Sequence, residues 1–115
     1  MNKNMDTTTI SVKKEQLSHN GKSIKIKYVS FPKELQGFAG GFVSEKRDSR
    51  YLIVIDRTRI PLLQRKALGH ELAHIYMNHF DQDKRPVQDI EKEANINAWK
   101  YYRLYKSGSL EAVSD

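Results

Sequence analysis

The pentapeptide HELAH at residues 70–74 is the feature that most constrains this chain. His70 and His74 are four positions apart, which places them on the same face of an α-helix, so both imidazoles can reach one metal ion. Glu71 lies about 100° around the same helix. There its carboxylate can take a proton from a water that the metal activates, but it is badly placed as a ligand. A His-Glu-x-x-His run on a helix therefore predicts a zinc site with Glu71 as general base.

The residues that flank HELAH favour such a helix. Pro61 suits the first turn of a helix, and residues 62–80 contain one glycine and no proline. Leu68, Leu72 and Ile75 recur at helical spacing and form an apolar face for a core. The motif thus lies on a predicted amphipathic helix. The alternative is a purely structural pair of buried, hydrogen-bonded histidines.

Composition limits the chemistry that this chain can use. Its 115 residues contain no cysteine, which excludes disulfides, thiolate zinc sites and a cysteine nucleophile. Any metal must therefore be held by histidine and carboxylate side chains. The length predicts one domain over residues 1–115, with flexible segments at residues 1–10 and 107–115.

The charge balance is basic, with 20 Lys and Arg against 14 Asp and Glu and a net charge of +6. These basic residues are scattered over several segments, and no helix-turn-helix, zinc-finger or RNA-binding signature accompanies them. Direct binding of nucleic acid is therefore not expected. No apolar run approaches the roughly 18 residues that a membrane span needs, and the sequence predicts a cytoplasmic protein without membrane contact.

Three short strands precede the metal helix in the predicted fold. Residues 23–29 alternate apolar and charged side chains, residues 38–43 form a second, glycine-containing strand, and residues 51–55 form a buried strand. Residues 45–50 are predicted to be a polar turn. A second helix is predicted over residues 87–105. These patterns predict an α+β fold in which a small antiparallel sheet packs on the metal helix, followed by a second helix that carries a ligand.

The third metal ligand must come from outside the HELAH motif. A catalytic zinc usually takes three protein ligands and keeps one position for water. The candidates are His79, Asp81, Asp83, Asp89, Glu91 and Glu93. If the metal helix continues, His79 points away from the face of the two histidines by about 140°. Asp81 and Asp83 fall in a predicted loop, where carboxylates are also expected for solubility alone.

The second helix offers the better candidates. Glu91 and Glu93 differ in direction by about 200°, so only one of them can face the metal. Glu91 is favoured because it shares its face with Ala94 and Ala98, whose small side chains let two helices approach closely. Glu93 remains the alternative on a more polar face. Asn95, one turn beyond Glu91, is a candidate to accept the second ring N–H of a ligand histidine, or else is an ordinary helix amide.

The residue that stabilises an oxyanion is left open by the sequence. The possible donors are Tyr76, His79, Tyr101 and Tyr102. Aromatic residues at helical spacing are more often part of a core, and packing is the favoured role for Tyr101 and Tyr102. Trp99 is interpreted as a core or interface residue in the same way.

HELAH followed by EKEAN at residues 91–95 resembles the ImmA/IrrE family of metallopeptidases. The pattern of that family is a HExxH helix and a later helix with Glu-x-x-Ala-Asn, and the resemblance spans residues 38–98. It implies that His70, His74 and Glu91 are zinc ligands and that Glu71 is the catalytic base. Residues 96–102 (INAWKYY) depart from the Phe-Ala-Ala continuation that is common in the family, and this leaves the substrate open.

The resemblance implies a gluzincin-like, zinc-dependent endopeptidase that cleaves or inactivates a cognate helix-turn-helix repressor of a mobile element or stress response. One alternative is a non-catalytic protein with the same zinc fold that binds a transcription regulator without cutting it. Another is a regulator that relies on its positive charge to bind nucleic acid. The presence of Glu71 favours the enzyme, because a structural zinc site has no use for a general base.

Overall fold

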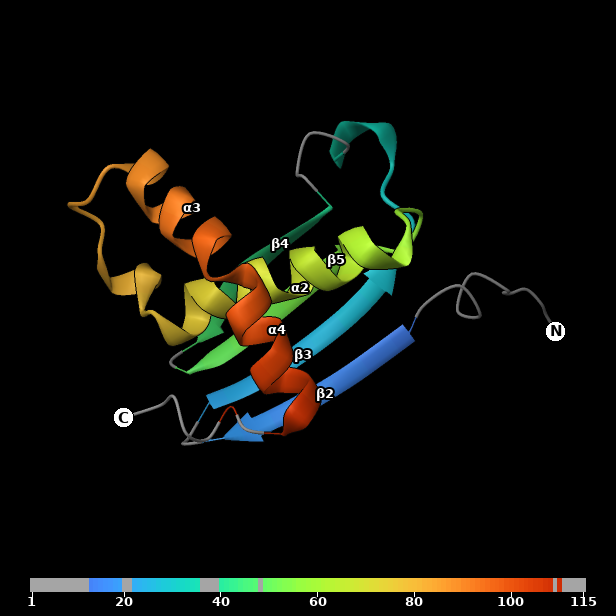
Figure 1. The fold of residues 1–115 in the computed structure, drawn as a ribbon, viewed down its shortest axis with the longest axis horizontal. Coiled ribbons are helices and arrows are strands. Elements are labelled where there is room, and N and C mark those ends of the chain that lie inside the picture. The colour runs from blue at the N-terminus through green and yellow to red at the C-terminus, as the bar shows by residue number, and fades with distance from the viewer. Residues whose placement is uncertain (1–12, 20–21, 36–39, 48, 109, 111–115) are drawn as a thin grey trace, which may run out of the picture.

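The computed structural model describes residues 13–19, 22–35, 40–47, 49–108 and 110 of the chain. Figure 1 shows α2 and α4 against one side of the sheet, with α3 beside the C-terminal part of α2. The elements in chain order are β2 (Lys13–His19), β3 (Lys22–Val29), η1 (Lys33–Leu35), β4 (Gly41–Arg47), β5 (Arg50–Asp56), α2 (Pro61–Tyr76), η2 (His79–Asp81), α3 (Val87–Ile96) and α4 (Ala98–Ser107). The predicted α+β class is confirmed.

The sheet is mixed, with the strand order β2-β3-β5-β4. The β2–β3 and β4–β5 pairs are antiparallel, but β3 pairs with β5 in parallel. The prediction of an antiparallel sheet is therefore wrong for the central pair. β3 and β4 follow each other in the sequence but are not neighbours in the sheet. β5 lies between them and pairs with both. β5 belongs in the centre because four consecutive residues, Ile53 to Asp56, are buried, so both of its faces are covered.

One additional strand and one strand boundary also differ from the prediction. β2 was not predicted, because KKEQLSH is polar, as is typical of a strand at the edge of a sheet. β4 continues to Arg47, which shortens the predicted turn at residues 45–50 to the two positions before β5. One of them, Ser49, has a φ of 62°. Gly41 lies close to β5, because a Cβ there would be 2.9 Å from the Cδ1 of Ile55.

The core lies between one face of the sheet and the helices. Its buried side chains come from β3, β5, α2, α3, α4 and one residue after α4, and they are Ile24, Ile26, Tyr51, Ile53, Ile55, Ala67, Leu68, Leu72, Ala73, Ile75, Ala94, Tyr101 and Leu110. The predicted apolar face of the metal helix is confirmed, since Leu68, Leu72 and Ile75 are all buried. This packing holds α2 beside β4 and β5, and it fixes where the histidines of the motif point.

Both predicted helices differ from the structure, the first in where it ends and the second in being interrupted. α2 ends at Tyr76, and Asn78 adopts the left-handed conformation with a φ of 60°. Asparagine tolerates this conformation well and often follows the end of a helix. The second predicted helix is two helices, α3 and α4, separated at Asn97. The side chain of Asn97 donates to the carbonyl of Glu93 over 2.8 Å and so competes with the regular helical hydrogen bonds.

Of the predicted flexible ends, residues 1–10 and most of 107–115 lie outside the described residues. Ser107 ends α4, Gly108 follows it with a φ of 75°, and Leu110 is 7% exposed within the core. None of the helices in the described ranges is both long enough and apolar enough to cross a bilayer.

Gly69 allows the close approach of α2 and α4. Gly69→Ala is therefore expected to lower the free energy of unfolding by about 1–3 kcal/mol or more. A Cβ at this position would collide with the backbone carbonyl of Ala98 and lie 3.1 Å from the Cβ of Tyr102. Because the obstacle is backbone, the helices must move apart. Urea unfolding followed by circular dichroism measures the change.

Lys66→Ala is the control, because Lys66 lies on the exposed side of the same helix. Its effect is expected to stay within about 0.5 kcal/mol. Equal stabilities for Gly69→Ala and the wild type would contradict the close crossing of α2 and α4.

Candidate metal centre

The two histidines of HELAH lie on one face of α2 and point toward the same place. The Nε2 atoms of His70 and His74 are 3.1 Å apart. Their side chains are 18% and 10% exposed, so both rings are largely removed from water. The structure therefore brings the two histidines of the motif together at one point.

Glu91 brings a carboxylate from α3 to the same point. Its Oε1 lies 2.9 Å from the Nε2 of His70, and its Oε2 lies 3.1 Å from the Nε2 of His74. One ligand atom from each of the three residues can be chosen so that all lie within 4.8 Å of one another. These three residues form a group that could hold a metal ion, as the sequence predicted.

Hydrogen bonds alone do not satisfy this cluster well. If each Nε2 carries a proton for Glu91, two N–H donors face each other across 3.1 Å. A cation that takes the lone pairs of both rings removes that conflict. Two imidazole nitrogens and one carboxylate oxygen are also a known ligand set of catalytic zinc sites. The residues present therefore fit a divalent metal such as zinc.

Burial keeps His74 in the form that a metal requires. Burial of the ring lowers the pKa of His74 to about 4, although the negative charge of Glu91 acts to raise it. The ring is therefore neutral at physiological pH and offers a nitrogen lone pair. Metal binding by histidine depends on this neutral form.

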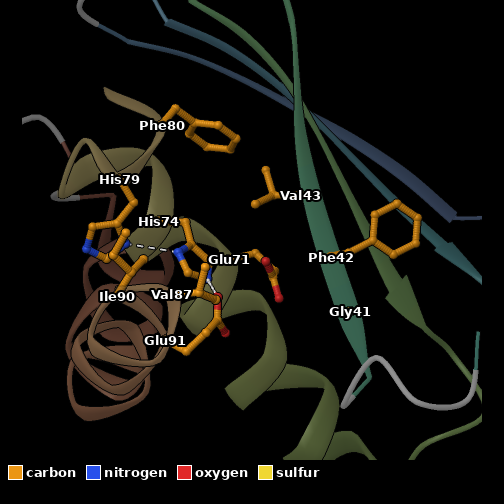
Figure 2. A pocket seen from close by; sticks show the side chains of 10 residues that line it. All are labelled: Gly41, Phe42, Val43, Glu71, His74, His79, Phe80, Val87, Ile90 and Glu91. Carbon is orange, nitrogen blue, oxygen red and sulfur yellow. Dashed lines mark hydrogen bonds and ion pairs between the residues drawn. The ribbon is translucent and has the colours of Figure 1, made fainter. Parts of the chain in front are cut away.

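Glu71 is next to the cluster but does not belong to it. The residue is 6% exposed, and its side chain points into the space between α2 and β4 (Figure 2). Burial, reinforced by the negative charge of Glu91, raises the pKa of Glu71 to about 8. A buried carboxyl group with a pKa near neutrality is suited to accept and return a proton.

A pocket of about 350 Å³ opens beside these groups. It lies between β4, at the edge of the sheet, and the helices α2 and α3 (Figure 2). Its lining residues are Gly41, Phe42, Val43, Glu71, His74, His79, Phe80, Val87, Ile90 and Glu91. Apolar side chains make up most of this wall, so the pocket suits an apolar group held next to the reactive residues.

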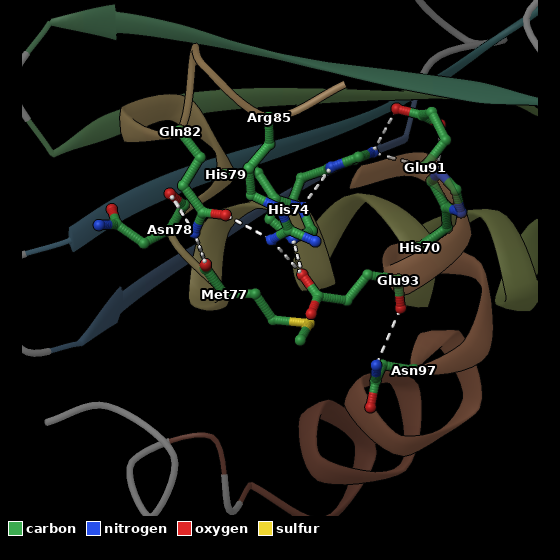
Figure 3. A network of polar contacts seen from close by, with 10 residues as sticks. All are labelled: His70, His74, Met77, Asn78, His79, Gln82, Arg85, Glu91, Glu93 and Asn97. Atoms are coloured by element: carbon green, nitrogen blue, oxygen red, sulfur yellow. Dashed lines mark hydrogen bonds and ion pairs between the residues drawn. The ribbon is translucent and has the colours of Figure 1, made fainter. Parts of the chain in front are cut away.

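His79 lies behind His74 and outside the group of ligands, and its ring contacts that of His74. Its Nδ1 is 2.9 Å from the Nδ1 of His74, and its Nε2 is 2.6 Å from Oε1 of Glu93 (Figure 3). The expectation that His79 points away assumed that the helix continues, whereas α2 ends at Tyr76 and the left-handed Asn78 redirects the chain. Asparagine at position 78 was the signal in the sequence for this turn.

The other candidate ligands lie elsewhere. Glu93 contacts His79 and Arg85. The exposed aspartates in η2, in the loop that follows and on α3 stay outside the ligand group; they are Asp81, Asp83 and Asp89. Asn95 is exposed, and no hydrogen bond joins its side chain to His70 or His74 in the described part of the chain. The contact that was sought for Asn95 is made to His74 by His79 instead.

The tyrosines that were considered as oxyanion donors pack in the core. Tyr76 and Tyr101 stack with ring centroids 6.2 Å apart, and Tyr102 packs against the same cluster. The buried hydroxyl of Tyr76 has no hydrogen-bond partner among the residues that the structure describes. Trp99 meets Tyr102 edge to face at 6.0 Å. None of these four aromatic residues lines the pocket.

Comparison with known proteins gives one match. The family model of Peptidase M78, described as the IrrE N-terminal-like domain, matches residues 12–102. That range contains the whole ligand group, Glu71 and the lining of the pocket. No curated protein and no solved structure matches the chain.

Proposed function

The chain belongs to the Peptidase M78 family, and we propose that it is a zinc-dependent, gluzincin-like endopeptidase with Glu71 as its general base. The observation that carries this proposal is the convergence of His70, His74 and Glu91 beside a buried Glu71. A module that only binds a partner has no need for a buried carboxyl group at this position. The arrangement therefore supports catalysis over the non-catalytic alternative.

The chemistry divides between the metal and Glu71. A bound zinc ion would polarise the scissile carbonyl and make water more acidic. The carboxylate of Glu71 accepts a proton from the attacking water and then donates it to the nitrogen of the leaving amine. Glu71 is placed for both transfers because its side chain points into the pocket beside Glu91 (Figure 2).

The same pocket suggests how a peptide is held. β4 is an edge strand, so part of its backbone hydrogen-bonding groups point away from the sheet. An extended peptide can pair with this edge as an additional strand. A side chain of that peptide then enters the pocket between Val43, Phe80 and Ile90. We propose a preference for a large apolar residue next to the scissile bond.

Zinc-loaded protein is therefore expected to cut unstructured peptides beside large apolar residues, with no cutting after chelation of the metal. Ile90→Lys should reduce kcat/KM for the preferred peptide by about 10–200-fold, because a charged side chain replaces an apolar wall of the pocket. A peptide library analysed by mass spectrometry identifies the preferred site, and initial rates measure the effect.

Ile96→Lys is the matched control, because Ile96 lies on the same helix, is 72% exposed and does not line the pocket. Its activity should equal that of the wild type. Equal losses in the two variants would contradict the assignment of the pocket, and no cutting of any peptide by zinc-loaded protein would contradict the proposed activity.

We further propose that the physiological substrate is a helix-turn-helix repressor of a mobile element or stress response, acted on in the cytoplasm. The family membership supports this choice of substrate. The net charge of +6 favours attraction to an acidic segment of such a partner. Mass spectrometry of a purified cognate repressor after incubation distinguishes cleavage from binding alone. A stable complex without products would favour the non-catalytic alternative.

A further inference from the structure

Behind the ligand His74, the structure contains a continuous chain of hydrogen-bonded groups (Figure 3). The Nδ1 of His74 meets the Nδ1 of His79 at 2.9 Å. The Nε2 of His79 meets Oε1 of Glu93 at 2.6 Å, and Nη1 of Arg85 donates to the same oxygen over 3.0 Å. Three elements, α2, η2 and α3, thus contribute one group each to this chain, and the loop before α3 adds Arg85.

The acceptor at one end of the chain determines the direction of every hydrogen bond. Oε1 of Glu93 forms an ion pair with the guanidinium of Arg85 and lies 2.6 Å from the Nε2 of His79, so Glu93 is placed as a carboxylate that only accepts. The Nε2 of His79 must then carry the proton that it donates to Glu93. With its proton on Nε2, the His79 ring presents a bare Nδ1, which is placed to accept the Nδ1–H of His74 over 2.9 Å. His74 is left with a bare Nε2, which is the atom that faces His70 and Glu91.

Local structure holds this chain firmly in place. His79 is 7% exposed, which restricts its ring to this position. The side chain of Gln82 donates to the carbonyls of Met77 and Asn78 over 2.9 and 3.2 Å. These bonds satisfy carbonyls at the end of α2 and stabilise the turn that directs His79 back toward His74.

We propose that His79 and Glu93 are positioning residues that orient His74 and fix its tautomer for metal binding. This inference rests on the proposed metal site and extends it to residues that do not touch the metal. Outer partners of ligand histidines commonly serve this purpose, usually as a carboxylate in direct contact with the ring. Here a second imidazole lies between the carboxylate and the ligand, which lets Glu93 act on His74 from α3.

Zinc affinity, measured by competition with a chelating indicator, tests the inference without any substrate. His79→Phe should weaken zinc binding by about 10–100-fold, because both hydrogen bonds are lost. His79→Gln should retain most of the affinity, since its amide can accept from His74 and donate to Glu93. Glu93→Ala should also weaken binding, whereas Asp89→Ala, on the same helix but outside the chain of contacts, should not.

The outcomes separate this inference from the proposed function. Unchanged affinity in His79→Phe, or an equal loss in folded His79→Gln, would overturn the positioning role. If His79→Phe does not fold, the partly exposed Glu93 carries the test through Glu93→Ala. Zinc bound tightly by the wild type without peptide cleavage would count against the function alone, and no zinc binding by the wild type would overturn both.

Nitrogen NMR of zinc-loaded protein labelled at histidine provides a second readout, because it measures the tautomer of each ring directly. We expect His79 to carry its proton on Nε2 and to have a bare Nδ1. A proton on Nδ1 of His79 would overturn the inference whatever the zinc affinities are, because that nitrogen could not then accept from His74.

Discussion

Replacing Glu71 with glutamine is expected to reduce peptide cleavage by about 10²–10⁴-fold while zinc remains bound, the range typical for loss of a general acid–base group. Glutamine has nearly the same shape as glutamate but cannot accept a proton from water. Glu71 is not one of the three ligands, so its loss leaves the metal group intact. Single-turnover cleavage rates and zinc content, measured on the same preparation, test both parts of this expectation.

Folding should be affected far less than catalysis. Because burial and Glu91 raise the pKa of Glu71 to about 8, the metal-free protein already holds this group in its neutral form at pH 7. A neutral amide therefore replaces a neutral acid, and the free energy of unfolding without metal should change by less than about 1 kcal/mol. Full activity in Glu71→Gln would contradict the assigned role.

Glu34→Gln is a suitable control for the same substitution elsewhere. Glu34 is exposed on η1 and lines no part of the pocket. We expect wild-type rates and zinc content in this variant. A comparable loss of rate in Glu34→Gln would mean that the assay responds to surface charge and not to the general base.

The sequence predicted those parts of the site that depend on local geometry. HELAH specifies the relative positions of His70, His74 and Glu71, because a single helix fixes them. Glu91 was predicted by a weaker argument, that small neighbours on its face allow α3 to approach α2. The buried Ala94 agrees with that argument. Each of these inferences needed only the period of a helix.

The features that the sequence did not predict depend on tertiary contacts. The parallel pairing of β3 with β5 is decided by which strand gains most from a central position. β2 is specified by pairing with β3 and not by its own apolar pattern. The position of His79 depends on one residue, Asn78, whose left-handed conformation ends the helix early. A shift of the helix end by a few residues was enough to reverse the direction of a side chain.

Removing the carboxylate of Glu91 is the second large effect that we expect, and it distinguishes a ligand from an outer partner. Glu91→Ala should weaken zinc binding by more than the roughly 10–100-fold that is typical for loss of an outer partner. Glu91 contacts both histidines directly, at 2.9 and 3.1 Å, whereas Glu93 acts on His74 only through His79. The expected order of zinc affinities is therefore wild type, then Glu93→Ala, then Glu91→Ala.

Unfolding experiments measure the same difference independently of any indicator. A metal that binds only the folded protein stabilises it by about 4.1 kcal/mol when its free concentration is 1,000 times Kd. At a fixed zinc concentration, the wild type should gain stability, Glu93→Ala should gain less, and Glu91→Ala should gain almost none. Without metal, the three proteins should differ little, because the side chain of Glu91 is 52% exposed and that of Glu93 is 33% exposed. Equal gains in Glu91→Ala and the wild type would mean that another residue completes the metal site.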